Sequence, residues 1–345
     1  MTVAVVGAGM AGAAAASTLR AMGFSVEVFD KSRAVGGRMS SKRQEHGYLD
    51  LGAQYFTART PLFKQQVEQW LATEVVTCWP ADCYKYELGR LTASADTTSR
   101  FIGNPSMHTP VKALLAGQSV HLNCRISRLR FVSSGLQTQT EAAGWYLFDQ
   151  HNNSFGPYQA LILTLPPVQL QTLLATTFMP AEPGYSDIHQ LITQLQPQVL
   201  LPCWAVSLQL AAPIATAADA IFVKEGNLSW LARQNSKPGR VNKADNWLVH
   251  FSAQSTAVHL RAEPQELVAL AKAEMELIFQ QTFTVSNATT HRWLYAQINP
   301  AVSQIKPDYH AGLKLAFAGD WMLGGRVENA YLSGVAAARE VSADV

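Results

Sequence analysis

The sequence predicts an α/β fold with two lobes, and three observations support this prediction. The apolar, β-branched run Val3–Val6 leads directly into a GxGxxG pattern at residues 7–12. An alanine-rich stretch over 13–22 and a second strand-like segment, Ser25–Phe29, follow in the β-α-β order of a Rossmann-type domain. A chain of 345 residues also leaves room for a second lobe, since domains commonly hold roughly 100–150 residues.

The three glycines of this motif have separate physical roles. Gly7 lets the chain turn, Gly9 lets the backbone approach a pyrophosphate, and Gly12 lets the helix pack closely on the strand. The N-terminus of that helix then faces the phosphates. Asp30 closes the second strand, where its carboxylate can accept hydrogen bonds from both ribose hydroxyls of an adenosine. The N-terminal segment therefore predicts a dinucleotide site.

Composition excludes several classes of function. Lys and Arg number 27 against 25 Asp and Glu, and there is no basic run of the kind that follows a phosphate backbone, so we expect no nucleic-acid partner. The four cysteines are scattered without metal-ligand spacing, so we expect no metal site and a reducing, cytoplasmic location. No uncharged apolar run reaches the length of about 18 residues that a membrane span needs.

Two segments after the first β-α-β unit favour FAD over NAD. In residues 30–38 the pair Gly36-Gly37 lets the loop fold back over the cofactor, and Arg38 brings positive charge to the pyrophosphate. Residues 49–56 read as a short strand with a glycine kink at Gly52, which permits close approach of the backbone to a ring.

A third segment lies at the far end of the chain. The apolar run Leu315–Ala318 delivers Gly319-Asp320, whose carboxylate can accept from ribityl or phosphate-side hydroxyls. Residues 324–330 then lead into a helix that we expect over 331–341. Its N-terminal amides could bind the pyrimidine end of a flavin, where negative charge grows on reduction.

These segments resemble the flavin-dependent amine oxidase superfamily, whose members join an N-terminal GxGxxG and GGR to a C-terminal GD segment. Within it the chain is most similar to the renalase group, particularly to its bacterial members. The strings that carry this resemblance are Asp30–Arg33, Gly36–Arg43, Gly52–Arg59, Trp230–Arg233, Ser236–Pro238 and His291–Ala296. One departure is Asn329, where the resemblance leads us to expect glycine. The last cysteine is Cys203, so the FAD should be bound non-covalently.

The resemblance implies a two-domain fold of the amine oxidase and p-hydroxybenzoate hydroxylase type: a Rossmann-type FAD-binding domain and a substrate domain with a mixed or antiparallel sheet. Strand-like runs at Val120–Phe131 and Leu161–Leu165 belong to the first domain, and the chain is expected to leave it at Pro166-Pro167. We therefore expect the FAD-binding domain at residues 1–55, 105–166 and 305–345. The substrate domain is expected at residues 56–104 and 167–304.

We predict cofactor contacts throughout these segments, and the resemblance adds an adenine contact from a residue in the strand-like run after 120. The predicted residues are Gly7, Gly9, Met10, Ala11, Gly12, Asp30, Lys31, Gly37, Arg38, Met39, Ala53, Gln54, Ile126 (the adenine contact), Gly319, Asp320, Arg326, Val327, Asn329 and Ala330.

The candidate catalytic residues are His291, Trp293 and Tyr295. They alternate along a strand-like segment and so share one face, where they could form an aromatic wall over the flavin. His291 could orient a polar substrate group, or it could simply be satisfied by backbone hydrogen bonds. Cations that could bind a substrate pyrophosphate are Arg43, Arg59, Arg233 and Lys237, with Arg240 as a further candidate; in each case a solvated loop residue is the alternative.

The second lobe shows no acid–base pair at a recognisable spacing, and a hydride donor with its own lone pair needs none. The resemblance implies an oxidase that converts misreduced 2- or 6-dihydro-NAD(P) isomers to NAD(P)+ by hydride transfer to flavin N5, with O2 reduced to hydrogen peroxide. The alternatives are an amine oxidase that acts on a small amine and a flavin-binding module without turnover. An NAD-dependent dehydrogenase leaves Gly36-Gly37-Arg38 and Gly319-Asp320 unexplained. The sequence leaves the oligomeric state open.

Overall fold

The computed structural model describes residues 1–45, 47–133, 142–177, 185–195, 200–240, 244–302 and 309–344. The chain divides into two compact units, each of which is discontinuous in sequence. Unit 1 comprises Met1–Gly37, Val111–Leu200 and Ile298–Val345, and unit 2 comprises Arg38–Pro110 and Leu201–Gln297.

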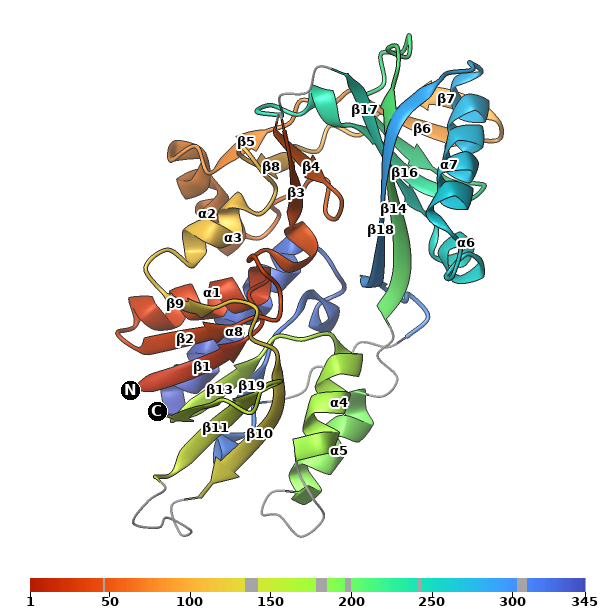
Figure 1. The fold of residues 1–345 in the computed structure, drawn as a ribbon. Coiled ribbons are helices and arrows are strands. Elements are labelled where there is room, and N and C mark those ends of the chain that lie inside the picture. The colour runs from red at the N-terminus through yellow and green to blue at the C-terminus, as the bar shows by residue number, and fades with distance from the viewer. Residues whose placement is uncertain are drawn as a thin grey trace. The chain divides into compact units, whose positions relative to one another are not determined.

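Unit 1 is built on a parallel sheet with the strand order β19-β13-β1-β2-β9 among the described residues (Figure 1). The strands are β1 (Thr2–Val6), β2 (Ser25–Phe29), β9 (Ser119–His121), β13 (Ala160–Leu163) and β19 (Leu315–Phe317). The central strand β1 lies between two parallel neighbours with its residues from Val3 to Val6 buried, which explains why its sequence is a continuous apolar run. The predicted Rossmann-type α/β sheet is confirmed.

Two helices pack closely together beside this sheet (Figure 1). They are α1 (Met10–Ala21) and α8 (Val327–Asp344). Gly334 makes their close approach possible, because a Cβ at this position would lie 2.1 Å from the carbonyl oxygen of Ala11. Unit 1 also holds an antiparallel sheet of β10 (Ile126–Val132), β11 (Gly144–Asp149) and β12 (Ser154–Tyr158), and the helices α4 (Pro167–Thr177) and α5 (Tyr185–Leu195).

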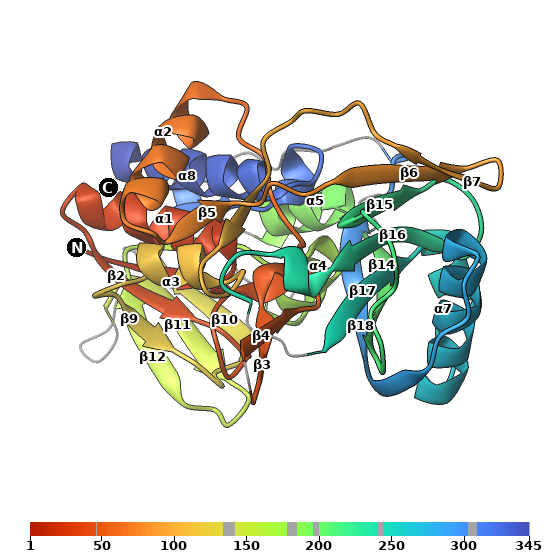
Figure 2. The same cartoon turned by 90° about the horizontal axis from the view of Figure 1, so that it is seen from above.

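Unit 2 is built on a mixed sheet with the strand order β18-β14-β17-β16-β15-β6-β7 among the described residues. The strands are β6 (Cys83–Glu87), β7 (Arg90–Ala93), β14 (Leu200–Leu210), β15 (Ala220–Val223), β16 (Leu228–Arg233), β17 (Asp245–Phe251) and β18 (Val285–Ile298). Helix α7 (Pro264–Phe279) lies along this sheet, and its buried residues Leu267, Ala271 and Met275 join the core of the sheet (Figure 2).

The remaining elements are short. They are α2 (Pro61–Ala72), α3 (Thr109–Leu114), α6 (Ala253–Val258), the hairpin of β3 (Ser41–Gln44) and β4 (Gly47–Asp50), the pair of β5 (Val76–Cys78) and β8 (Phe101–Gly103), and the 3-10 turns Gly37–Met39, Gln234–Ser236, Ala311–Leu313 and Asp320–Met322.

The structure differs from the expected elements at three places. The run Val120–Phe131 is not one strand but parts of β9 and β10, which belong to different sheets and are separated by a turn at Asn123, whose φ is +53°. The C-terminal helix begins at Val327, not at residue 331. Residues 49–56, expected as a strand, leave β4 at Asp50 and continue as a loop.

The two units also divide the chain at other residues than the expected domains. Residues 38–55 and 105–110 fall in unit 2, whereas residues 167–200 stay in unit 1. The hairpin β3–β4 explains the first difference, because it packs through Leu49 and Leu51 on Ala205 and Leu248 of the unit 2 sheet. Residues 298–302, expected in the substrate domain, also belong to unit 1, and the expected boundary at 304/305 lies outside the described residues.

Cysteine pairing, metal ligands and membrane spans can be compared with what the composition suggests. All four cysteines are free thiols, and three of them are buried. The described residues contain no group of three or more His, Cys, Asp or Glu that could hold a metal ion. None of the described helices is both long enough and apolar enough to cross a membrane.

Candidate functional site

The glycine-rich turn between β1 and α1 is packed so tightly that larger residues do not fit at two of its positions. Gly7 has a φ of +112°, and a Cβ there would lie 2.3 Å from Thr164 Oγ1. A Cβ on Gly12 would lie 1.8 Å from the carbonyl oxygen of Gly7. At Gly9, in contrast, a Cβ would meet no heavy atom of the described residues within 4 Å. The turn is therefore held closed at its base and open at Gly9, as backbone approach to a pyrophosphate requires.

The carboxylate of Asp30, at the end of β2, bonds to the loops that follow β1 and β2. Its Oδ2 accepts a hydrogen bond from Ala8 N at 2.7 Å, and its Oδ1 accepts one from Ser32 N at 2.7 Å. An ionised carboxylate has about four acceptor positions, so Asp30 retains capacity for ribose hydroxyls. The backbone of Asp30 also accepts a hydrogen bond from Cys124 N at 2.9 Å. This bond brings the start of β10, with the buried Ile126, to the same strand end.

The loop after Asp30 folds back over the glycine-rich turn. Gly36 N donates to the carbonyl oxygen of Ala8 at 2.9 Å, and a Cβ on Gly37 would lie 3.3 Å from Gly9 Cα. Both glycines have positive φ, +127° and +53°, which side chains disfavour. This is the local geometry expected from the glycine pair.

These residues fit a dinucleotide. Helix α1 begins with Met10 and Ala11 after Gly9, and the described residues supply no side-chain cap to its first amides. Free amides and the positive end of the helix dipole attract phosphate. With the open space at Gly9 and the carboxylate of Asp30, unit 1 would hold the pyrophosphate and the adenosine ribose of FAD.

The C-terminal segment forms a turn before α8. Gly319 N donates to Ser333 Oγ at 3.0 Å, and Gly325 N donates to the carbonyl oxygen of the buried Asp320 at 2.9 Å. Gly324, Gly325 and Arg326 have φ values of +93°, +80° and +86°. For Arg326 this is a costly conformation of about 1–2 kcal/mol. Strain of this kind often marks a functional site.

Asn329, which stands where the resemblance suggests glycine, has a structural role in this turn. Its side-chain amide donates to the carbonyl oxygen of Leu323. The bond links the first turn of α8 to the loop that precedes it. Val327 and Ala330 lie in the same first turn. The predicted cofactor residues from 319 to 330 therefore lie together at the start of α8.

In unit 2, the segment Asp50–Gln54 is held by its backbone carbonyls. The oxygen of Leu51 accepts hydrogen bonds from Trp293 Nε1 and His250 Nε2, both at 3.0 Å. Gln54 Nε2 donates to the oxygens of Asp50 and Gly52, at 2.6 and 2.9 Å. These carbonyls are therefore occupied by the protein itself.

Arg38 lies against the same segment, and the next residue, Met39, is buried. Ala53 N donates to the carbonyl oxygen of Arg38 at 2.9 Å, and a Cβ on Gly52 would lie 2.0 Å from that oxygen. The guanidinium of Arg38 donates to the oxygen of Ala296 in β18 at 3.1 Å. The structure thus brings two predicted cofactor segments together within unit 2, and Gly52 is required by this contact.

A cluster of buried charged side chains contacts the same segment through Asp50 and Gln54. Asp50 Oδ2 accepts hydrogen bonds from Lys237 Nζ at 3.2 Å and from Arg240 Nη2 at 2.9 Å, and the side chains of all three residues are 0% exposed. Lys237 Nζ also donates to Gln54 Oε1 at 2.9 Å, which in turn accepts from Gln234. Burial alone would raise the pKa of Asp50, but the charges of Lys237 and Arg240 lower it below its ordinary value.

The three candidate catalytic residues lie on β18, at the edge of the unit 2 sheet. The rings of His291 and Trp293 meet edge to face with centroids 4.3 Å apart, which shows that alternate residues share a face as expected. Tyr295 is the next residue of this series. Desolvation of the ring and the charge of Lys42 both lower the pKa of His291 below its ordinary value, which favours the neutral ring, although the residue as a whole is exposed.

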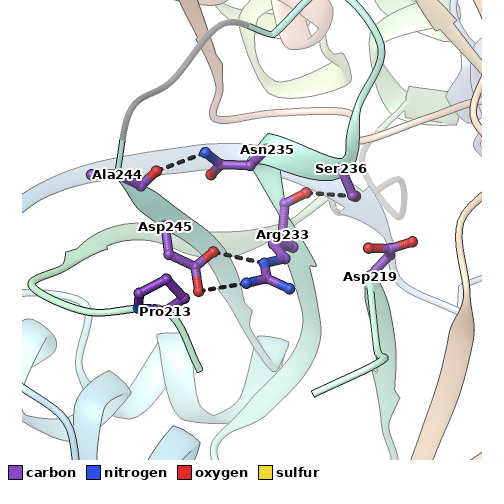
Figure 3. A pocket seen from close by; sticks show the side chains of 7 residues that line it. All are labelled: Pro213, Asp219, Arg233, Asn235, Ser236, Ala244 and Asp245. Atoms are coloured by element: carbon purple, nitrogen blue, oxygen red, sulfur yellow. Dashed lines mark hydrogen bonds and ion pairs between the residues drawn. The ribbon is translucent and has the colours of Figure 1, made fainter. Parts of the chain in front are cut away.

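The structure does not bring the four predicted substrate cations together. Arg43 and Arg59 are exposed on β3 and before α2. Arg233 lines a polar pocket of about 300 Å3 together with Asn235 and Asp219 (Figure 3). In that pocket its guanidinium donates two hydrogen bonds to Asp245, at 2.7 and 3.0 Å.

Two of these cations are paired inside unit 2. The charge of Arg233 is paired with the buried carboxylate of Asp245, and the Arg233 side chain stays 21% exposed. The ammonium of Lys237 is enclosed by Asp50 and Gln54, and Arg240 is likewise buried on Asp50. A buried charge needs such a partner, because its desolvation is otherwise uncompensated. Lys237 and Arg240 therefore present no exposed charge, whereas a substrate contact from Arg233 stays a prediction.

Sequence reasoning missed the partners of the Asp50–Gln54 segment. Asp50 lies in the segment 49–56 that the sequence singles out, but the sequence assigns no role to Asp50 or to His250. The one available signal was the conjunction of two cations, Lys237 and Arg240, with an acid in a strand of otherwise apolar residues. Sequence separation hid it, because Asp50 and Lys237 are 187 positions apart.

Several solved structures share the fold over nearly the whole chain. A protein from Exiguobacterium sp. 255-15 proposed to be a protoporphyrinogen oxidase has a TM-score of 0.78 at 10% identity and covers 100% of this chain and 99% of its own. Cyclohexylamine oxidase from Brevibacterium oxydans IH-35A has a TM-score of 0.75 at 13% identity, with 99% of both chains covered. Putrescine oxidase bound to putrescine has a TM-score of 0.70 at 13% identity, again with 99% of both chains covered.

A curated relative matches only a short part of the sequence. Over 52 residues, 15% of this chain, the sequence is 48% identical to 4,4'-diapophytoene desaturase (4,4'-diaponeurosporene-forming) of Staphylococcus haemolyticus (strain JCSC1435). The matched stretch spans 10% of the length of that desaturase.

A dinucleotide site on a Rossmann-type sheet, joined to a unit with a large mixed sheet, defines an FAD-dependent oxidoreductase. Two sequence profiles agree with this class: the NAD(P)-binding Rossmann-like domain matches residues 5–70, and the flavin containing amine oxidoreductase family matches residues 78–342. The chain belongs to the flavin containing amine oxidoreductase family. The predicted cofactor, FAD, and the predicted two-domain fold of the amine oxidase type are thereby confirmed.

Proposed function

We propose that this protein is a renalase-like oxidase that converts misreduced 2- or 6-dihydro-NAD(P) isomers to NAD(P)+ and reduces O2 to hydrogen peroxide. The supporting observation is the aromatic face of β18. The ring of His291, whose pKa is lowered, contacts Trp293, and Tyr295 follows on the same face. When bound, FAD would accept a hydride at N5 and return the electrons to O2.

The chemistry of the substrate explains why such a face suffices. The nitrogen of a dihydropyridine ring has a lone pair that drives the hydride from the ring carbon and leaves a pyridinium, so no protein base takes a proton. The chain's own contribution is then to bind and orient the ring. Trp293 is fixed by its bond to the oxygen of Leu51, and we propose that Tyr295 and His291 contact the substrate beside it.

The roles of the two units follow from this proposal. We propose that unit 1 binds FAD through the predicted residues from 7 to 37 and from 319 to 330, with Ile126 on the adenine. In unit 2, Arg38, Met39, Ala53 and the backbone of Gln54 would contact the cofactor, while β18 would contact the substrate. Four free thiols favour the reducing cytoplasm as the compartment.

Oxidation of a small amine is the second candidate. The same aromatic face could admit an uncharged amine, and two of the proteins with the same fold are named cyclohexylamine oxidase and putrescine oxidase. Their identities of 13% carry the fold and not the substrate.

Anaerobic stopped-flow tests the proposal. The FAD-loaded protein is mixed with 2- and 6-dihydro-NAD(P) isomers and, separately, with a panel of amines, while flavin absorbance is followed. We expect rapid bleaching by a dihydropyridine isomer and formation of NAD(P)+ in equal amount. Bleaching by amines alone would favour the amine oxidase, and no bleaching by any donor would indicate a flavin-binding module without turnover.

A pair of histidine variants tests the site. His291→Gln should slow bleaching by the dihydropyridine at least tenfold, because the ring beside Trp293 is lost. His151→Gln, in an exposed loop of unit 1, is the matched control and should bleach like the wild type. Equal rates for both variants would remove His291 from the site.

A further inference from the structure

The buried cluster of Asp50, Lys237 and Arg240 holds one carboxylate and two cations. All three side chains are 0% exposed, so water and salt do not screen them as they would on a surface. The charges of Lys237 and Arg240 lower the pKa of Asp50, which is therefore ionised at pH 7. Burial lowers the pKa of Lys237 to about 8, which still leaves the ammonium mostly charged at pH 7. The cluster thus carries one net positive charge.

This charge acts on a short and rigid piece of backbone. Lys237 Nζ lies 2.9 Å from Gln54 Oε1, and the amide of Gln54 in turn donates to the oxygens of Asp50 and Gly52. The next carbonyl, that of Leu51, is held by Trp293 and His250. His250 adds no charge of its own, because burial lowers its pKa to about 4. The net charge therefore sits beside Gln54, and among the described residues Asp50 is the one carboxylate in the ion pairs of Lys237 and Arg240.

The cluster holds one more cation than is needed to neutralise Asp50. A single cation would neutralise Asp50, and a second buried cation costs desolvation without a second partner charge. Arg240 already donates to Asp50 and to the carbonyl oxygens of Gly103 and Pro105. Lys237 is the surplus cation, and it is the one that reaches Gln54.

We propose that Lys237 tunes the redox potential of the flavin: its buried charge, relayed to the segment Gly52–Gln54, favours the reduced cofactor over the oxidised one. This inference rests on the proposed function, in which residues 53 and 54 contact FAD. Two-electron reduction places negative charge on the flavin, so a buried positive charge nearby stabilises the product of reduction. Lys237 is accordingly a positioning and electrostatic residue that touches neither substrate nor cofactor.

The test is a charge series measured on FAD-loaded protein. Lys237→Met removes the surplus charge and should lower the equilibrium constant for two-electron reduction about tenfold, which is about 30 mV for such a couple. Lys237→Gln, which keeps a donor toward Asp50, should shift it in the same direction. The double variant Asp50→Asn with Lys237→Met retains Arg240 alone, restores one net positive charge, and should return the potential toward that of the wild type.

Chemical reduction against a reference dye gives the potential without any substrate, so the result does not depend on which donor the enzyme uses. Lys85→Met is the matched control: this exposed lysine of unit 2 pairs with Glu87, and its loss should leave the potential unchanged. Equal potentials for wild type, Lys237→Met and Lys237→Gln would overturn the inference and leave the proposed function standing. If the reduction potential is lowered in Lys237→Met and the double variant does not restore it, the inference is also overturned. A protein that takes up no FAD would overturn both.

Discussion

Neutralising Asp50 is expected to destabilise the fold strongly. In Asp50→Asn the shape is kept, but the hydrogen bonds from Lys237 at 3.2 Å and from Arg240 at 3.2 and 2.9 Å lose their charged acceptor. Removing one partner from a buried ion pair costs about 3–5 kcal/mol, because the remaining charges are left without compensation. Deprotonation of Lys237 limits the loss, since its pKa is already lowered to about 8 by burial.

Urea unfolding followed by circular dichroism at pH 7 measures this effect. We expect Asp50→Asn to lower the free energy of unfolding by about 3–5 kcal/mol. Glu87→Gln is the control, because it breaks an ion pair with Lys85 in which both side chains are over 40% exposed, and such pairs contribute about 0–1 kcal/mol. A loss below about 1 kcal/mol in Asp50→Asn would refute the reasoning, because the cluster would then not depend on a charged acceptor.

Four further perturbations test other parts of the structure. Burial lowers the pKa of His250 from 6.5 to about 4, so between these pH values the unfolded chain binds one more proton than the folded chain. The free energy of unfolding should therefore fall by up to about 3 kcal/mol as the pH decreases through this window. In urea titrations, His250→Gln should lose that part of the pH dependence. Gly12→Ala places a Cβ 1.8 Å from the oxygen of Gly7, so thermal unfolding should show a loss of about 1–3 kcal/mol. Gly9→Ala meets open space in the described residues, so it should retain stability but bind FAD at least tenfold more weakly in fluorescence titrations. Asn329→Ala removes the bond to the oxygen of Leu323 and should cost about 1 kcal/mol together with some FAD affinity.

Three of these predictions have an outcome that would contradict their premise. An unchanged pH profile in His250→Gln would mean that the ring is not held neutral by burial. Equal FAD affinity in Gly9→Ala and the wild type would place the pyrophosphate away from α1. A stability of Asn329→Ala within error of the wild type would show that its amide does not fasten the turn before α8.

The local sequence determined the dinucleotide half of this protein. The turn at residues 7–12 has one solution that satisfies its contacts: Gly7 requires a positive φ, and Gly12 leaves no space for a Cβ. Strand β2 was predicted with its ends at Ser25 and Phe29, because Gly23 ends the helix before it and Asp30 follows its last residue. Interactions among neighbours in sequence decide such features, so they can be read from the chain alone.

Longer-range packing decided the rest. Nothing in the run Val120–Phe131 shows that β9 pairs with β2 while β10 joins another sheet, since the partner strands lie elsewhere in the sequence. Residues 38–55 looked continuous with the nucleotide motif, yet Leu49 and Leu51 pack on strands more than 150 positions away in unit 2.

The charges show the difference most clearly. Sequence identified Arg233 and Lys237 as cations in loops, for which a free, substrate-binding charge is a reasonable expectation. The tertiary structure pairs them with Asp245 and Asp50, burying Lys237 fully and leaving the Arg233 side chain 21% exposed, and only the fold could supply these partners. The free energy of a charge depends on its desolvation and on the groups within a few ångströms, and both are properties of the folded chain rather than of the residue.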